Sequence, residues 1–214
     1  DITKMLISLN SLPYIIVATA PSMDGYSSAT SSMIFGGMKV SIRSKAPNVI
    51  IGDVNIMKNC PKEMMKSGLG DILAKYASVC DWRLGSFING EYFCEEVAQI
   101  VRASVKKCIN NANKLLDCDD DAIASVFEGL VHSGLTMNYI GLSRPASSVE
   151  HYFSHFWEMR SLAFGTGKDS HGIQCAIGTV YTARIYDFLR NYQPDKEKAM
   201  RASQPSITTN TQLS

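Results

Sequence analysis

The sequence has 214 residues, of which 45% are hydrophobic, and a formal net charge of +1, which fits one large or two small globular domains. The near-zero charge excludes a global field that would favour nucleic acid or an anionic membrane surface. No apolar run approaches the roughly 18 residues of a membrane span. Six dispersed cysteines without a C-x-x-C pair, and no visible signal peptide, predict reduced thiols in a cytoplasmic protein.

The first sixty residues have the pattern of an α/β domain. A helical stretch over 2–11 leads into the apolar run 14–18, which predicts a buried strand of a parallel sheet. The polar loop that follows lies at the carboxyl end of this strand, where α/β sheets bind ligands. A Gly-Gly turn predicts a hairpin over 35–42, and another strand is expected over 49–54. The chain starts without methionine inside a helical pattern, so we expect a fragment.

Beyond Pro61 the spacing of apolar residues is helical. Three consecutive aspartates predict the start of one helix, and Gly141 predicts its end. The expected helices cover 62–84, 91–116, 121–140, 147–163 and 171–191. The expected division is an α/β part over 1–60, a helical part over 61–195 and a polar tail over 196–214.

Three of the four histidines lie close together in the sequence. His151 and His155 are four residues apart and share one face of a helix. An S-x-x-E capping box predicts that this helix starts near Ser147, and Ser170 is an N-cap candidate for a helix starting at His171. Imidazoles near two helix starts suit a divalent metal that takes three protein ligands and keeps one open position.

The third ligand of such a site is expected to be a carboxylate. Asp71 is the candidate, because an aspartate inside an apolar helical pattern needs a partner. It could equally be an ordinary helix residue paired with Lys75, four residues on. His132 stands alone and is expected to be an ordinary histidine, whereas the His151–His155 pair by itself leaves both interpretations open.

Two other polar features also have two interpretations. The run over 143–148 joins Arg144, Ser147 and a helix start, which favours an anion such as phosphate. A capped loop explains the same run equally well. Asp24 lies in a loop of small residues and is either a turn aspartate or a contact to a polyol.

An ordered set of motifs resembles the sn-glycerol-1-phosphate dehydrogenases, a family within the iron-containing alcohol dehydrogenase and dehydroquinate synthase-like superfamily. The similarity extends over roughly residues 1–195. The motifs are PSMDGYSS at 21–28, GLGDILAK at 68–75, DW at 81–82, SRPAS at 143–147, EH at 150–151, SHFWEM at 154–159 and HG at 171–172.

The resemblance implies a dinucleotide-binding α/β domain packed on a C-terminal helical domain. It also implies zinc, alternatively iron or nickel, held by Asp71, His151 and His171, together with NAD or NADP. The implied reaction is reversible hydride transfer between dihydroxyacetone phosphate and glycerol 1-phosphate. His155 and Asp24 match positions near the reacting centre, and we expect His155 to exchange a proton. The positions that match the loop along the cofactor are Thr19, Ser22 and Ser27.

The chain departs from the family in lacking the Gly-rich phosphate-binding turn before Asp1 and the segment after about residue 195, so a truncated enzyme is expected. Ser148 and Tyr152 stand where the family often has Gly and His. The alternatives are a glycerol dehydrogenase, a dehydroquinate synthase-like enzyme, or a truncated, non-catalytic scaffold. The expected partner is a small phosphorylated polyol or ketone, without nucleic acid or a membrane span. The choice of NAD or NADP and a homo-oligomer are left open.

Overall fold

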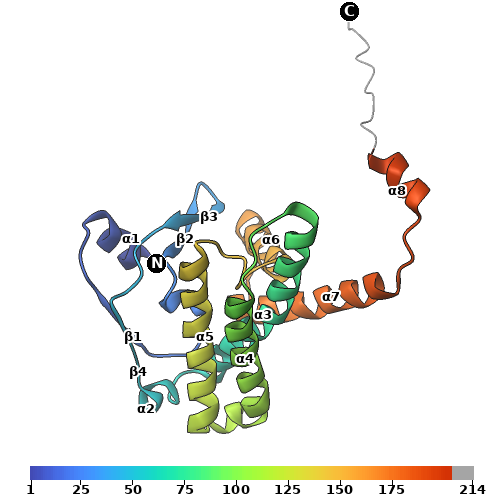
Figure 1. Ribbon diagram of the computed structural model, residues 1–214. Coiled ribbons are helices and arrows are strands. Elements are labelled where there is room, and N and C mark those ends of the chain that lie inside the picture. Colours follow the sequence, from blue (N-terminus) through green and yellow to red (C-terminus); the bar gives the residue numbers. More distant parts are fainter. Residues whose placement is uncertain (204–214) are drawn as a thin grey trace, which may run out of the picture. The chain divides into compact units, whose positions relative to one another are not determined.

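The structure, a computed structural model, describes residues 1–203 and has a short α/β part followed by helices (Figure 1). Residues Asp1–Ala183 form one compact unit, and a second unit beginning at Arg184 holds the end of the last long helix and one short helix. In chain order the elements are α1 (Ile2–Leu9), β1 (Ile15–Ala18), η1 (Asp24–Tyr26), β2 (Thr30–Phe35), β3 (Met38–Arg43), β4 (Val49–Gly52), α2 (Val54–Met57), α3 (Lys62–Asn89), α4 (Glu95–Asn111), η2 (Ala112–Asp117), α5 (Asp120–Ile140), α6 (Val149–Phe164), α7 (His171–Asn191) and α8 (Lys196–Ser203).

Local signals determine the ends of the central helices. The Asp119 side chain accepts a hydrogen bond from the Ala122 backbone N–H at 2.9 Å, which caps the start of α5. Gly141 ends α5 with a φ of 74°, a conformation that favours glycine. Gly90 ends α3 in the same way, five residues beyond the expected position. The expected helix ends at 141 and near 165 are therefore confirmed, whereas the end predicted at 84 is wrong.

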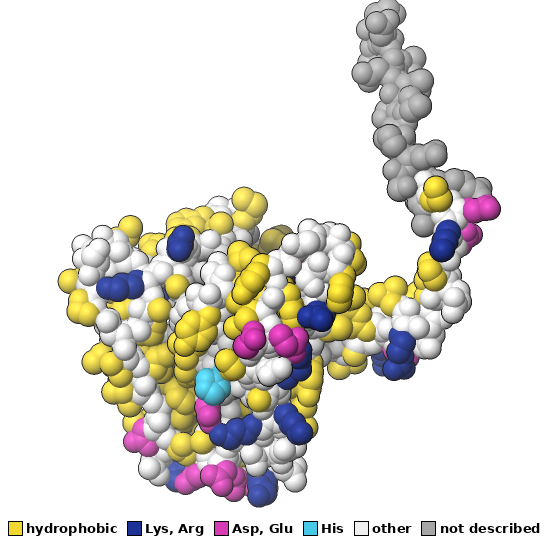
Figure 2. Space-filling model, viewed as in Figure 1, with side chains coloured by type: hydrophobic (Ala, Val, Ile, Leu, Met, Phe, Trp, Pro, Cys, Tyr) yellow, Lys and Arg dark blue, Asp and Glu magenta, His cyan; other side chains and the backbone are white. Residues whose placement is uncertain are grey.

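The four described strands form two separate pairs. β1 and β4 are parallel, with Ile15 opposite Val49, whereas β2 and β3 form the expected antiparallel hairpin around the Gly-Gly turn. The burial expected for the run 14–18 is wrong in part, because Ile15 and Val17 are 59% and 55% exposed, whereas Ala18 is buried. Figure 2 shows hydrophobic side chains gathered on the face over β1 and β4.

The core lies among α3, α4 and α5, with α3 in the middle. On α4 the buried face is formed by Val97, Val101, Val105 and Cys108. Ile100 and Ile109, which were expected on the apolar side, flank this face and are more than 40% exposed. The residues of this core cluster with no exposed surface are Met57, Met65, Ile72, Trp82, Ala98, Val105, Cys108, Ile123 and Leu130.

Two glycines allow the close contacts on which the later site depends. A methyl group at Gly172, in the first turn of α7, would overlap the backbone carbonyl of Ser67 on α3. A methyl group at Gly68 would overlap the backbone carbonyl of Pro21, in the loop after β1. Because both positions carry only hydrogen, α7 and this loop lie directly against α3.

Three further expectations can be compared with the structure. α6 begins at Val149 rather than Ser147, because the Ser148 hydroxyl pairs with Asp81 and not with its own helix. The polar tail expected from residue 196 begins with α8, and residues 204–214 lie outside the described residues. None of the described helices is long and apolar enough to cross a membrane. The boundary near residue 61 and the cytoplasmic location stay predictions.

Candidate metal centre

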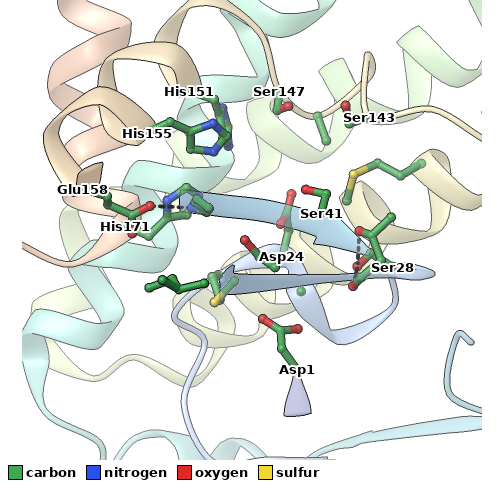
Figure 3. Close-up of a pocket in the computed structure, with 18 of the residues that line it drawn as sticks. Asp1, Asp24, Ser28, Ser41, Ser143, Ser147, His151, His155, Glu158 and His171 are labelled. Carbon is green, nitrogen blue, oxygen red and sulfur yellow. Dashed lines mark hydrogen bonds and ion pairs between the residues drawn. The ribbon is translucent and has the colours of Figure 1, made fainter. Parts of the chain in front are cut away.

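Side chains from three helices bring potential metal ligands together. The ring centroids of His151 and His171 are 5.2 Å apart. Figure 3 shows these two histidines and His155 gathered on one side of a pocket. The groups whose ligand atoms all lie within 4.8 Å of one another are Asp71 on α3, His151 on α6, and His171 and Cys175 on α7. These are nitrogen, oxygen and sulfur donors that divalent transition metals accept.

Asp71 is a fully buried carboxylate with both oxygens in use. Lys75 Nζ donates to Oδ1 at 2.7 Å, and the backbone N–H of Asp24 donates to Oδ2 at 2.9 Å. Lys75 also contacts Asp24 Oδ2 at 2.9 Å. Burial by itself would raise the pKa of Asp71, but the positive charge of Lys75, followed by His171 and His151, lowers it to about 2. Asp71 is therefore ionised at neutral pH, as a metal ligand must be.

His151 is held from behind by the buried carboxylate of Glu150. Glu150 Oε1 lies 2.8 Å from Nδ1 of His151 and also accepts hydrogen bonds from Ser148 N and Ser78 Oγ, each at 2.9 Å. Burial opposes ionisation of Glu150, but the hydrogen bond and charge of His151 lower its pKa. Nε2 of His151 therefore faces the cluster, 3.8 Å from Oδ1 of Asp71. A carboxylate in this position fixes the tautomer and ring orientation of a ligating histidine.

His171 has a similar support from a hydroxyl group. Ser154 Oγ donates to Gln174 Oε1 at 2.9 Å and lies 3.1 Å from His171 Nδ1, so it can accept a hydrogen bond from Nδ1–H and leave the lone pair of Nε2 for a metal. Burial lowers the pKa of His171, which favours the neutral imidazole that a metal needs. Burial raises the pKa of Cys175, whose Sγ lies 3.6 Å from Nε2 of His171. Cys175 is therefore protonated while no metal is bound, and Asp71 and the two histidines already form a donor set that fits a metal.

His155 stands beside this cluster rather than in it. Its ring centroid is 6.2 Å from that of His151 and 6.3 Å from that of His171. Burial, and then the positive charge of Lys39, lower the pKa of His155 to about 4. At neutral pH it is a neutral imidazole that can accept a proton.

A cavity of about 370 Å³ adjoins the histidines. The β2–β3 hairpin forms one wall, on which Lys39 contacts Glu158 of α6 at 2.5 Å. Lys168, in the loop after α6, lies 3.6 Å from the other oxygen of Glu158. Asp24 and Ser147 also line this cavity, which lies beside the cluster and is large enough for a small metabolite.

Comparisons with known proteins agree with this geometry. A family model described as iron-containing alcohol dehydrogenase matches residues 1–61. A glycerol-1-phosphate dehydrogenase (NAD(P)+) of Thermococcus sibiricus is 34% identical over 96% of this chain and 57% of the relative. The enzyme of the same name from Halalkalibacterium halodurans is 32% identical over 87% of this chain and 47% of the relative. Over nearly its whole length the chain is similar to the glycerol-1-phosphate dehydrogenase family. It spans about half the length of the curated relatives it matches.

A solved structure supports the fold. Glycerol dehydrogenase from Schizosaccharomyces pombe matches with a TM-score of 0.68 at 20% identity, covering 85% of this chain and 47% of that chain. The short α/β part followed by a largely helical domain is therefore confirmed as the fold class of this family.

The residues expected along the family's cofactor lie in different environments. Thr19 is exposed just after β1, and Ser22 lines a second cavity of about 360 Å³ beside α1 and β1. Ser27 is buried, and its hydroxyl donates to the Val131 carbonyl at 2.6 Å, which attaches the loop to α5. These three cofactor assignments stay predictions.

Of the two residues expected to contact phosphate, only one lines the cavity beside the histidines. Ser147 lines the large cavity. Arg144 is not among the residues that line it, and its guanidinium binds Glu91 through two hydrogen bonds of 2.6 and 2.7 Å and contacts Asp81 at 3.4 Å. With two carboxylates already on Arg144, other basic side chains are better placed for a substrate anion.

Sequence reasoning missed several members of the site. Cys175 follows His171 by four residues, a spacing that could have placed it on the same helix face. Glu150 was treated only as part of a capping box, although it is adjacent to His151. The pairing of Asp71 with Lys75, weighed as an alternative to a metal, is present together with the cluster, so the two interpretations do not exclude each other.

Proposed function

We propose that the protein is a metal-dependent, NAD(P)-linked oxidoreductase that interconverts dihydroxyacetone phosphate and glycerol 1-phosphate by hydride transfer. The observation that carries the proposal is the convergence of Asp71, His151 and His171 beside a cavity, in a chain whose relatives bear the name glycerol-1-phosphate dehydrogenase. Zinc is the first candidate metal, because one carboxylate and two imidazoles with an open position form a common catalytic zinc site.

Asp71, His151 and His171 would hold the metal. When bound, a divalent ion supplies Lewis acidity, which polarises a substrate carbonyl. Asp71 contributes the negative charge, and the two histidines are presented by Glu150 and Ser154 with Nε2 toward the centre.

The remaining roles belong to groups around the cavity. His155 is neutral at pH 7 because its pKa is lowered to about 4 by burial and by Lys39, and we assign it the proton exchange with the substrate hydroxyl. Asp24 is held by Lys75 and by the Ser133 hydroxyl at 2.9 Å, so its role is to keep the loop after β1 against the cluster. This loop would carry the nicotinamide contacts of Ser22 and Thr19.

The test is metal content and turnover of the purified chain. We expect about one zinc, iron or nickel per chain, lost in His151→Ala and in His171→Ala because each change removes a nitrogen donor. His132→Ala is the matched control, since His132 pairs with Ser104 at 2.9 Å between α4 and α5, away from the cluster. Full metal content in both site variants would refute the site assignment.

Substrate comparison tests the finer assignment. Metal-loaded protein should oxidise NADH or NADPH with dihydroxyacetone phosphate faster than with dihydroxyacetone. Equal rates would favour a glycerol dehydrogenase, and metal binding without turnover of either substrate would favour the scaffold alternative. His155→Ala should keep its metal and lose turnover, whereas normal turnover in this variant would refute the proton-transfer role.

A further inference from the structure

The wall of the large cavity opposite the histidines is built from one face of the β2–β3 hairpin. Side chains two residues apart on a strand share a face, so Lys39 and Ser41 point to the same side. Ser32 lies directly opposite Ser41 in the antiparallel register and therefore joins this face. All three residues line the cavity. At these three positions the hairpin therefore presents two hydroxyl groups and one ammonium group to the cavity, all of which can donate hydrogen bonds.

Two lysines meet one carboxylate on this wall. Lys39 Nζ lies 2.5 Å from Glu158 Oε2, and Lys168 Nζ lies 3.6 Å from Glu158 Oε1. The side chains of Lys39 and Glu158 are only 18% and 13% exposed, so their charges are poorly screened. Three charged groups with two positive signs leave a surplus of one positive charge on the cavity wall.

Next to this wall, Asp71 and Asp24 share the single ammonium of the buried Lys75, which leaves one negative charge at the candidate metal site. A divalent ion held there would outweigh that charge, so the wall would keep its positive charge in the metal-loaded protein. Lys39, His155 and His171 line the same cavity. A ligand that reaches the histidines therefore meets the ammonium of Lys39 within the same cavity.

We propose that Lys39, Lys168 and the hairpin hydroxyls of Ser32 and Ser41 form a subsite for a phosphoryl dianion, with the Glu158 carboxylate holding the two lysines together until the anion arrives. The inference rests on the proposed function, because it places the phosphate of a phosphorylated substrate in the cavity. Lysine binds phosphate as a compact point charge, and a phosphate monoester carries close to two negative charges at pH 7. The Glu158 carboxylate already balances one of the two ammonium charges. A ligand with two negative charges is therefore attracted to the lysines more strongly than a ligand with one.

The probe is inorganic phosphate added to the metal-free chain of residues 1–214, with binding followed by phosphorus NMR line width at constant ionic strength. Metal-free protein is used because phosphate can itself bind a metal. Lys39→Met should weaken phosphate binding roughly 10-fold or more, as for the loss of a hydrogen bond to a charged group. Lys168→Met should weaken it about 2- to 5-fold, because Lys168 is half exposed. Glu158→Gln should strengthen binding, since it removes the competing charge and keeps the side-chain shape.

Lys45→Met is the matched control, because Lys45 is exposed just after β3 and does not line the cavity. It makes the same change in net charge and should leave phosphate binding unchanged. Lys39→Arg should bind within about threefold of the unaltered chain, which keeps the test decisive if the methionine variant fails to fold. Equal weakening by Lys39→Met and Lys45→Met, or weakening by Glu158→Gln as large as by Lys39→Met, would overturn the subsite.

The two proposals fail in distinguishable ways. A chain that binds metal and turns over unphosphorylated dihydroxyacetone, but shows no Lys39-dependent phosphate binding, would overturn the subsite and leave an oxidoreductase. A chain that binds phosphate through Lys39 but holds no metal through His151 and His171 would support the subsite and refute the proposed chemistry.

Discussion

Replacement of Lys75 by methionine tests whether the buried charge network holds the candidate centre together. Lys75 has no exposed surface, and its ammonium contacts Asp71 Oδ1 at 2.7 Å and Asp24 Oδ2 at 2.9 Å. Methionine fills a similar volume but leaves two buried carboxylates facing each other without a cation. Because those carboxylates come from α3 and from the loop after β1, the change acts on the contact between the two elements.

Removing one partner of a buried ion pair costs about 3 to 5 kcal/mol, which for a chain of this size lowers the melting temperature by roughly 6 to 20 °C. The assay is urea and thermal unfolding of the metal-free chain, followed by circular dichroism. Lys66→Met on the same helix is the matched control, because Lys66 pairs with Glu63 at 3.9 Å on the surface and should cost less than about 1 kcal/mol.

Zinc provides a second readout of the same reasoning. The ion supplies a cation next to Asp71, so zinc should raise the melting temperature of Lys75→Met more than that of the unaltered chain. Unfolding of Lys75→Met within about 1 kcal/mol of the Lys66→Met control would refute the reasoning. Such a result would mean that Asp71 and Asp24 accommodate the loss by taking up protons.

Three other predictions follow from the site. Glu150→Gln should lower metal affinity about 10- to 100-fold in a chelator competition, because the charged partner of the ligating histidine is lost; unchanged affinity would contradict the supporting role. Proton NMR of the metal-free chain should show His155 titrating near pH 4, and stability should fall as pH drops from 6.5 toward 4, because only the unfolded state takes up that proton readily; a midpoint above 6 would contradict it. Iodoacetamide at pH 8 should label exposed Cys80 and spare Cys108, whose pKa burial raises to about 12, as read by peptide mass spectrometry; equal labelling would refute the burial.

Much of the helical part could be predicted because its signals are local. The Asp119 cap and Gly141 lie within one turn of the ends of α5, so neighbours in the sequence determine them. The hairpin followed from two glycines, which adopt positive φ values of 56° and 79° at the turn. The start of α6 was expected near Ser147, but the residue before the helix is Ser148, whose hydroxyl pairs with the distant Asp81 and makes no cap hydrogen bond.

The candidate ligands were accessible to sequence reasoning for a chemical reason. Histidines near helix starts and an aspartate in an apolar pattern are unusual in themselves, and Asp71, His151 and His171 stood out on that basis. The sequence did not show how these residues come together. Gly68 and Gly172 carry no side chain, which allows α3 to lie against the loop after β1 and against α7. Both glycines lie in the quoted motifs GLGDILAK and HG, but the sequence alone does not show which backbone each of them meets.

The sequence by itself determined the element types, the family and the three candidate ligands, because periodicity, caps and residue chemistry are written in neighbouring positions. Tertiary structure alone decided which charges face one another. Lys39 and Glu158 are 119 residues apart yet form one ion pair, and Asp24 meets the N-terminal half of α3 across 47 residues through Asp71. Such contacts depend on how the hairpin, α6 and α3 pack, and no spacing along the chain encodes a distance between side chains on separate elements.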